Sequence, residues 1–361
     1  MIKVVFLIHG FNTGGAETLV KNYALFLDKE KYDIAILCIE HRESPYEKIL
    51  KEAGIKVIYV CDYFRNKFSR KLGIKFKMRR IIRKIKPDII HSHLLMNTYI
   101  KFSKPNKNTK ICYTQHYDLS RMTKKEYIIL KWIIKHYKTT IIAINDDMCT
   151  ELNRKFYVNN TVVLNNGINL EPYEKKVEKD EIRKNISIPT DAFVIVHVGR
   201  FAEVKNHKFL VEVFNSIKKI KNNAYLLMIG SGKTENNVVE ELNGLGLDNS
   251  YKILHNRTDV PELLMASDAA IFPSVTEGLG IAVIEMQAAH LPVVASKGVP
   301  QKTKISNYIE YLDLNIGAEQ WAKQLVGLTE QNEKYFVYLK EWDIKESVKR
   351  LEKLYTEMIN K

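Results

Sequence analysis

The sequence predicts an α/β protein built from two doubly wound parallel-sheet domains, and three observations lead to this prediction. The chain has 361 residues, which is more than a single hydrophobic core usually holds. Short apolar segments alternate with longer segments of helical period, a pattern typical of a parallel sheet covered by helices on both faces. The alternation stops near residue 168 and then starts again, which indicates a domain boundary.

The first predicted domain comprises residues 1–168. Between most of its strands, apolar residues recur with helical spacing, as in Glu17–Leu27 and Ile74–Ile85. Its expected strands are Lys3–Ile8, Asp33–Ile39, Lys56–Val60, Ile89–His91, Ile111–Gln115, Thr140–Ile144 and Thr161–Leu164.

The second predicted domain comprises residues 169–341 and follows a turn signal at Asn165-Asn166-Gly167. Ligands of such folds bind at the carboxyl ends of the strands, so we expect a site facing the gap between the domains. Residues 342–361 contain a charged helix that could pack on either domain, and packing on the first is favoured. The expected strands are Phe193–Val198, Ala224–Ile229, Tyr251–Leu254, Ala269–Phe272 and Pro292–Ala295.

Composition excludes several classes of protein. The four cysteines have no C-x-x-C spacing, which argues against a disulfide framework and against a zinc site. No run of about 18 apolar residues is present, and the apolar start of the chain is too short for a signal peptide. We therefore expect a cytoplasmic protein.

Basic residues are concentrated in the first half. Residues 1–170 hold 31 basic and 15 acidic side chains, a net charge of +16, whereas the rest of the chain has a net charge of −2. Arg65–Lys86 alone holds eleven Lys or Arg residues and no acid, with apolar residues on one helical face. Three interpretations fit this segment: an interfacial helix on anionic lipid, a nucleic-acid contact, or a core-facing helix with a solvated basic back.

A segment with glycines and glutamates follows the fourth strand of the second domain. Gly278 and Gly280 open an expected helix over 279–289, where free backbone amides attract phosphate. On one helical rise, Glu277 and Glu285 would lie roughly 12 Å apart along the axis. A glycosidase pair lies about 5–9.5 Å apart, so these carboxylates better suit the two ends of a long ligand. From spacing alone, a capped surface helix with two solvated glutamates is favoured.

This segment resembles the E-x7-E signature of the retaining, GT-B-fold glycosyltransferases of family 4, and the likeness continues through 286–289 and 292–296. The resemblance implies two Rossmann-like domains facing a central cleft, the first binding the acceptor and the second a nucleotide-sugar donor. It also implies that Glu277 contacts the donor sugar and Glu285 the ribose. The backbone amides implied for the distal phosphate are those of Gly278, Leu279 and Gly280.

Two cations five residues apart, Arg200 and Lys205, follow the strand that ends at Gly199. An arginine and a lysine can hold a diphosphate through charge-assisted hydrogen bonds, although a basic surface loop is the simpler interpretation of the residues alone. The run resembles the family segment G-R-x-x-x-x-K-N, and this implies a diphosphate-binding role for both side chains. Because a fixed pair of cations can stabilise the leaving group, we expect no metal and no other cofactor.

The segment that ends in Gly232-Lys233-Thr234 is similar to a Walker A loop, but Leu227 occupies the position where that motif requires its first glycine. It instead resembles the family's strand-end G-x-G turn near the nucleotide base. The resemblance thus places Gly230 at the nucleotide, and we assign Arg257, from the segment after the next strand, to the same ligand.

Two further matches lie in the first half. Gly14 and Gly15 resemble the family's G-G-A-E loop, which reaches the donor from the N-terminal domain. His116 follows a predicted strand, where the family has an active-site histidine. His91 and His93 are interpreted as lining a pocket at most, because no third ligand for a metal is evident.

The sequence therefore predicts a retaining glycosyltransferase that moves a sugar from a nucleoside diphosphate, with UDP the expected nucleotide, to a hydroxyl of a glycan or polyprenyl-linked glycan. Surface polysaccharide synthesis, of exopolysaccharide or capsule, is the expected process. Since family acceptors are often lipid-linked, an anionic membrane surface is favoured as the partner of Arg65–Lys86, and no nucleic acid is expected. No side chain is an obvious covalent nucleophile, so attack on the same face, assisted by the leaving phosphate, is expected.

Two alternatives remain open. A sugar-nucleotide epimerase of the same fold would convert the donor without an acceptor. A basic nucleic-acid-binding module would give a salt-sensitive gel shift and have no affinity for UDP. Only Phe68 and Phe76 interrupt the basic run as stacking aromatics, which argues against the second alternative.

Overall fold

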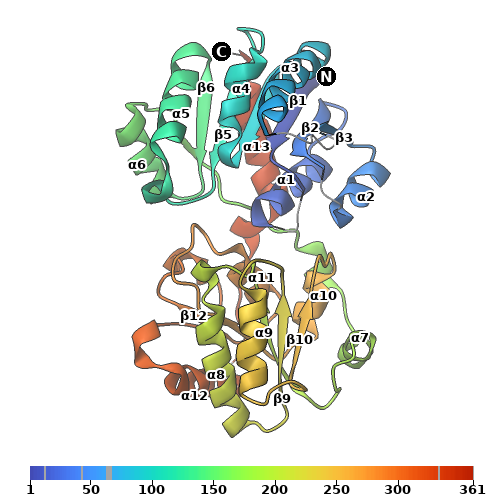
Figure 1. The fold of residues 1–361 in the computed structure, drawn as a ribbon, viewed down its shortest axis with the longest axis vertical. Coiled ribbons are helices and arrows are strands. Elements are labelled where there is room, and N and C mark those ends of the chain that lie inside the picture. Colours follow the sequence, from blue (N-terminus) through green and yellow to red (C-terminus); the bar gives the residue numbers. More distant parts are fainter. Residues whose placement is uncertain (12–13, 42–43, 62–66, 332–333, 361) are drawn as a thin grey trace. The chain divides into compact units, whose positions relative to one another are not determined.

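Two parallel β-sheets organise the chain, one in each of two units (Figure 1). The first unit contains Met1–Ile168 and Glu341–Lys361, and the second contains Asn169–Lys340. The computed structural model describes residues 1–11, 14–41, 44–61, 67–331 and 334–360, with side chains for all of these except 67–72 and 95. The predicted fold class of two doubly wound parallel sheets is confirmed.

The sheet of the first unit has the strand order β3-β2-β1-β4-β5-β6-β7, and every neighbouring pair is parallel. The order reverses direction at β1, whose two neighbours are β2 and β4. Ligands of doubly wound sheets bind at such a switch point. The strands are β1 (Ile2–Ile8), β2 (Tyr32–Glu40), β3 (Lys56–Cys61), β4 (Ile89–His93), β5 (Lys110–Gln115), β6 (Thr139–Ala143) and β7 (Val162–Val163).

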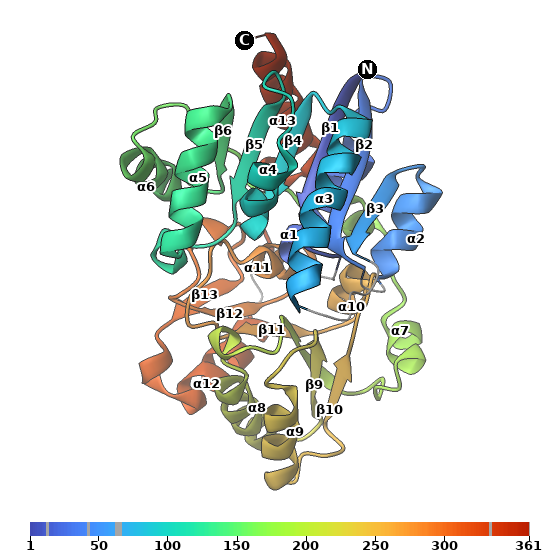
Figure 2. The ribbon, with the colours of Figure 1, turned by 45° about the horizontal axis from the view of Figure 1, so that its top comes forward.

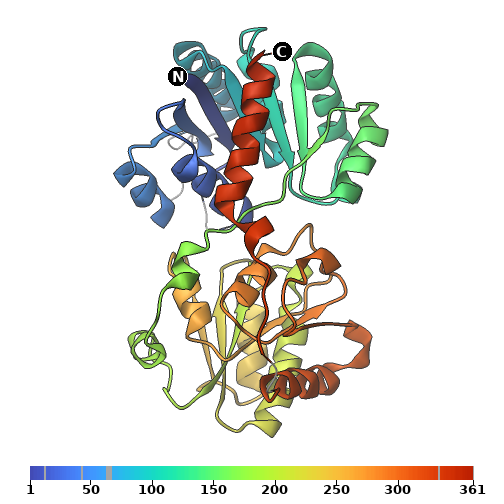
Figure 3. The same cartoon turned by 180° about the vertical axis from the view of Figure 1, so that it is seen from behind.

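Helices cover both faces of this sheet. Helices α1 (Gly15–Phe26), α2 (Pro45–Glu52) and α13 (Ile344–Asn360) share one core with β1 and β2, and Figure 3 shows α13 running along this face. Helices α3 (Lys67–Ile85), α4 (Asn97–Ser103) and α5 (Lys124–His136) pack on the other face (Figure 2). Helix α6 (Asp146–Phe156) packs beside β6 and β7.

Local sequence signals begin several of these helices. Ser44 accepts a hydrogen bond from the Tyr46 amide at the start of α2, where Pro45 also favours the first turn. Thr123 and Glu126 form a capping box at the start of α5, in which each side chain accepts from the other residue's backbone amide.

The basic segment Arg65–Lys86 contains the whole of α3, although Arg65 lies outside the described residues. Its apolar residues Ile74, Met78 and Ile82 are buried in the core against the sheet. The core-facing interpretation is therefore correct for this stripe, and insertion of the same stripe into lipid is excluded. In the described part of the chain, no helix is long and apolar enough to cross a membrane. The exposed side of α3 presents Phe76, Arg80, Arg83 and Lys84.

The C-terminal helix α13 belongs to the first unit. The Ile168 amide donates to the Trp342 carbonyl at 2.7 Å, and the Ile344 amide donates back to the Ile168 carbonyl at 2.9 Å. Further along α13, the hydroxyl of Tyr355 lies 2.6 Å from His91 Nδ1 on β4. Leu351 is fully buried against the same core. The last residues of the chain thus complete the core of the first unit.

The sheet of the second unit has the order β10-β9-β8-β11-β12-β13 and is also entirely parallel. The edge strand β13, which has four residues, was not predicted. The strands are β8 (Phe193–Val198), β9 (Ala224–Ile229), β10 (Tyr251–Leu254), β11 (Ala269–Phe272), β12 (Val293–Ser296) and β13 (Ile309–Leu312).

Two cores flank this second sheet. One contains buried residues of α8 (His207–Ile220), α9 (Glu235–Gly244) and α12 (Ala318–Thr329). The other contains buried residues of α10 (Val260–Met265) and α11 (Ile281–Ala288), and α7 (Lys179–Asn185) contributes the half-buried Ile182. The switch point of this sheet lies between β8 and β11.

Replacement of Leu351 by Ala should destabilise the first unit. The substitution leaves a cavity between α13 and the sheet, and large-to-small core changes cost about 2–5 kcal/mol. Differential scanning calorimetry should show a lower transition temperature for that unit. The matched control is Lys353→Ala on the exposed side of the same helix, which should change the free energy of unfolding by no more than about 0.5 kcal/mol. Equal effects of both substitutions would contradict the assigned role of α13.

Candidate functional site

The loops that follow β8 and β11 lie side by side at the carboxyl edge of the second sheet. The two strands are parallel neighbours, although more than 70 residues separate them in sequence. Beyond the strands, the Val275 amide donates to the Val204 carbonyl at 2.8 Å, so the loops remain paired. The sheet therefore brings the segment containing Arg200 and Lys205 against the segment containing Glu277.

Lys205 and Glu277 form an ion pair with 2.7 Å between Nζ and Oε1. Their side chains are only 18% and 14% exposed, so the pair is largely sheltered from water. The Lys205 ammonium also lies 4.4 Å from the centroid of the Phe272 ring, at the end of β11. These contacts fix the cation at the switch point of the sheet.

The two predicted arginines are in different situations. Arg200 is exposed, and within the described part of the chain its guanidinium has no hydrogen-bond or ion-pair partner. Arg257 instead donates from Nε to Asp259 Oδ1 at 2.8 Å and from Nη2 to Asp259 Oδ2, and this pairing raises the pKa of the guanidinium. Arg200 is thus ready to bind an anion, whereas Arg257 already has an acidic partner.

Helix α11 begins two residues later than predicted, and this corrects the separation expected for Glu277 and Glu285. The helix starts at Ile281, and its N-cap Gly280 has φ +80°, a left-handed conformation that glycine adopts without strain. Glu277 therefore lies in the preceding loop, where its amide donates to the Gly298 carbonyl at 3.0 Å. Only Glu285 is on the helix, so a separation based on one helical rise does not apply.

The start of α11 presents unpaired backbone donors. Among the described residues, the amides of Gly278, Leu279 and Gly280 donate no hydrogen bond. Free amides at a helix start, together with the helix dipole, form an anion-binding arrangement. Farther along α11, Glu285 lies near the buried hydroxyl of Tyr173. Burial is the main cause that raises the pKa of this hydroxyl, and the negative charge of Glu285 raises it further.

Gly230 allows two strand ends to approach closely. The Gly199 amide donates to the Ile229 carbonyl, and a Cβ atom at position 230 would lie 2.0 Å from the Gly199 carbonyl oxygen. Only a glycine fits against the backbone that carries Arg200. The structure thus explains Gly230 as a packing requirement next to the candidate site.

Two histidines that the sequence analysis did not assign lie next to Lys205. His197 and His207 are both buried, and burial lowers the pKa of both rings, that of His207 to about 4. His197 Nδ1 lies 2.9 Å from the Ile271 carbonyl oxygen and donates to it. Both rings are therefore neutral and add no positive charge beside Lys205. Their position at either end of the Gly199–Lys205 segment is the sequence signal that could have drawn attention to them.

In the first unit, the predicted residues also lie at the carboxyl edge of the sheet. Gly14 is the N-cap of α1, and a Cβ atom there would lie 2.5 Å from Glu17 Oε2, so the glycine makes room for that carboxylate. Gly15 is the first residue of α1. His116 follows β5, and its Nε2 lies 2.9 Å from His93 Nδ1. Burial lowers the pKa of His116 to about 4, so its ring is neutral near pH 7.

His91 and His93 are fully buried. His91 is held on both sides, by Tyr355 through Nδ1 and by the Thr114 hydroxyl through Nε2 at 2.7 Å. Its role is therefore structural, whereas His93 contacts His116 directly. Across the residues with described placement, no group of three or more His, Cys, Asp or Glu side chains could hold a metal ion.

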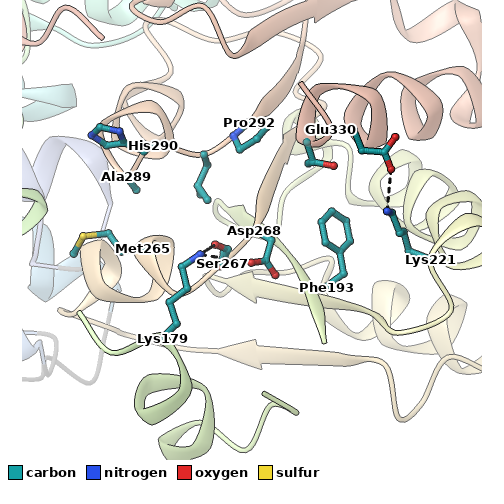
Figure 4. Close-up of a pocket in the computed structure, with 12 residues that line it drawn as sticks. Lys179, Phe193, Lys221, Met265, Ser267, Asp268, Ala289, His290, Pro292 and Glu330 are labelled. Carbon is teal, nitrogen blue, oxygen red and sulfur yellow. Dashed lines mark hydrogen bonds and ion pairs between the residues drawn. The ribbon is translucent and has the colours of Figure 1, made fainter. Parts of the chain in front are cut away.

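A hollow of about 540 Å³ lies at the opposite edge of the second sheet, by the amino ends of β8, β11 and β12 (Figure 4). Its lysines already have acidic partners, because Lys179 lies 3.5 Å from Asp268 and Lys221 lies 3.0 Å from Glu330. None of the predicted site residues lines it.

Comparison with known proteins gives matches in both units. The profile of Glycosyltransferase Family 4 matches residues 13–172, and that of Glycosyl transferases group 1 matches residues 178–351. The capsular polysaccharide biosynthesis glycosyltransferase CapH of Staphylococcus aureus is 24% identical over 340 residues, covering 90% of each chain. The UDP-Gal:alpha-D-GlcNAc-diphosphoundecaprenol alpha-1,3-galactosyltransferase of Escherichia coli is 24% identical over 286 residues, covering 75% of this chain and 73% of its own.

Among solved structures, Anabaena Alr3699/HepE in complex with UDP-glucose superposes with a TM-score of 0.76 at 14% identity. The superposition covers 99% of this chain and 100% of that protein. At this identity, the likeness shows a shared fold.

Replacement of Gly230 by Ala should destabilise the second unit and displace the Arg200 loop. The new methyl group would collide with the Gly199 carbonyl, and overpacking of this kind costs about 1–3 kcal/mol. The matched control is Gly244→Ala at the end of α9, where a Cβ atom meets nothing within 4 Å, so stability should stay the same or rise by up to about 1 kcal/mol. Calorimetry of both variants provides the test. An unchanged transition in the Gly230 variant would contradict the close approach.

Proposed function

Because this chain belongs to the glycosyltransferases of group 1 and family 4, which have the GT-B fold, we propose that it transfers a sugar from UDP to a hydroxyl of a lipid-linked glycan with retention at the anomeric carbon. The observation that carries the proposal is the set of positive groups at the ends of β8 and β11. An unpaired arginine, a sheltered lysine and three free amides converge on one edge of the second sheet.

The diphosphate of the donor would bind to Arg200, Lys205 and the amides of residues 278–280. The Lys205 ammonium has three N–H donors, so it can contact a phosphate oxygen while it keeps its ion pair with Glu277. These groups favour the negative charge that develops on the leaving phosphate, and this lowers the barrier. Fixed cations and amides would then take the place of a metal ion at the leaving group.

The remaining donor contacts follow the roles predicted from the sequence. Glu277, held in place by Lys205, would orient hydroxyl groups of the sugar, and Glu285 would hydrogen-bond to the ribose. Gly230 and Arg257 would lie near the nucleotide. For Gly14, Gly15 and His116 we retain the predicted contact with the donor.

The transfer itself needs no covalent intermediate on the protein. The bond between the anomeric carbon and the phosphate oxygen breaks, and the acceptor oxygen forms a new bond to that carbon on the same face. The acceptor hydroxyl gives its proton to the departing phosphate oxygen. The sheltered position of Lys205 and Glu277 supports this proposal, because electrostatic stabilisation is stronger where water is excluded.

The relatives' names support a lipid-linked acceptor used in surface polysaccharide synthesis. One is named for capsular polysaccharide biosynthesis and another for transfer to a diphosphoundecaprenol-linked sugar. The first unit also presents a cationic surface on the side covered by α3 and α5, and we propose that it contacts anionic phospholipid. Its exposed residues are Phe76, Arg80, Arg83 and Lys84 on α3, and Lys124, Ile128, Lys131 and Lys135 on α5.

Arg200→Ala and Lys205→Ala should each remove most turnover. Loss of one group that stabilises a developing anion costs about 10²–10³ in kcat. Glu285→Ala should mainly weaken UDP binding, because a ribose contact is present before the reaction as well as during it. Kinetics with a panel of UDP-sugars and calorimetric titration of UDP measure the two effects.

Lys208→Ala, which removes an exposed cation from α8, is the matched control and should keep normal activity. EDTA should leave the wild-type rate unchanged, and omission of the acceptor should abolish sugar turnover. Near-normal activity of both cation variants, or a strict requirement for added metal, would refute the assigned site.

The double substitution Arg80→Ala and Arg83→Ala should weaken binding to vesicles that contain phosphatidylglycerol. Each basic residue near an anionic surface contributes about 1 kcal/mol, so affinity should fall roughly thirtyfold at low salt. Vesicle sedimentation measures this change. Lys208→Ala with Lys219→Ala removes two exposed cations from the second unit and serves as the control. Equal losses in both double variants would indicate a nonspecific effect of net charge and would contradict docking through α3.

A further inference from the structure

His93 and His116 form a hydrogen bond, and the surroundings of the two rings indicate which ring is the donor. His93 Nδ1 and His116 Nε2 are 2.9 Å apart, so one nitrogen carries a proton and donates a hydrogen bond, and the other accepts that bond through its lone pair. Both rings are neutral near pH 7, because burial lowers the pKa of each, that of His116 to about 4. Each ring therefore carries a single proton, and two arrangements are available.

The other nitrogen of His93 distinguishes these arrangements. His93 is fully buried, and its Nε2 atom has no hydrogen-bond partner among the described residues. If His116 were the donor, the proton of His93 would lie on this nitrogen and form a buried N–H group without an acceptor, which is rare and costly. If His93 donates from Nδ1, its Nε2 carries only a lone pair. The second arrangement is therefore favoured.

The sheet holds the two rings in this relation. His93 is the last residue of β4 and pairs with Thr114 on β5, two residues before His116. Side chains two residues apart on a strand point to the same face, so the register directs His116 toward His93. The His93 ring also packs against Phe6 and His91, at centroid distances of 5.9 and 4.2 Å. His93 is thus a rigid donor.

We propose that His93 is a positioning residue that fixes His116 as the neutral tautomer with its proton on Nδ1. His116 Nε2 is occupied by His93, and Nδ1 has no partner in the described part of the chain. The ring thus offers its ligand a hydrogen-bond donor and not a base. The consequence for catalysis rests on the proposed function, in which His116 contacts the donor. His116 would donate to an oxygen of the bound sugar, and the acceptor proton would have to go to the leaving phosphate.

Nitrogen-15 NMR of the full-length chain with labelled histidine tests the tautomer directly. The chain has ten histidines, so the His116 and His93 signals are assigned by their loss in His116→Gln and His93→Asn. We expect a protonated Nδ1 and a bare Nε2 on His116, and a coupling across the hydrogen bond to His93 Nδ1. A proton on His116 Nε2, or on His93 Nε2, would overturn the proposal. Because no ligand is needed, this measurement is independent of the proposed function.

Kinetics test the consequence. His93→Leu removes the donor and should lower kcat/KM roughly tenfold, whereas His93→Asn keeps a side-chain N–H near the place of Nδ1 and should recover most of this loss. UDP affinity should be unchanged in both variants. Equal losses in both, or no loss in the Leu variant, would overturn the positioning role. Full activity of His116→Gln would refute the proposed contact of His116 with the donor. The tautomer of His116 would then still be tested by the NMR measurement, which does not depend on that contact.

Discussion

The Lys205–Glu277 ion pair depends on a single constraint, the adjacency of β8 and β11 in a parallel sheet. Parallel strands end at the same edge, so two loops that are far apart in sequence must meet there. The hydrogen bond from the Val275 amide to the Val204 carbonyl extends this pairing past the strands. It holds the backbone next to Lys205 against the backbone close to Glu277. Without this adjacency, Lys205 would be a solvated surface cation and Glu277 a solvated loop carboxylate.

The site concentrates positive charge without relying on the net charge of its unit. Residues 169–340 have a net charge of −2, yet Arg200, Lys205 and three free amides lie at one edge. Local geometry produces this, because the helix starts only at Ile281 and leaves the preceding amides unpaired. The basic excess of the first half includes exposed residues of α3 and α5, for which we propose a different role, long-range attraction to an anionic surface.

The sequence was sufficient for features that depend on local pattern. Apolar runs located all but one of the strands, and helical spacing correctly identified the α3 residues that are buried, although spacing alone could not distinguish a protein core from lipid as their partner. The use of one helical rise for Glu277 and Glu285 failed because the helix begins only after Gly280, whose left-handed conformation no periodicity reveals. The contact of His93 with His116 depends on strand register, and the packing of Gly230 on Gly199 depends on strand order, so neither was predicted.

Neutral histidines recur at the carboxyl edges of both sheets, and electrostatics explains why neutral rings suit these places. In the second unit, His197 donates its Nδ1 proton to a backbone carbonyl and its Nε2 carries no proton, so it fills space beside Lys205 without repelling that cation. In the first unit, His93 would donate from the same nitrogen to His116. A charged ring in either position would carry the high cost of a buried ion, and at His197 it would also compete with Lys205 for anions. Burial thus keeps each ring neutral, and in the proposed reaction the charges would lie on the arginine, the lysine and the phosphates.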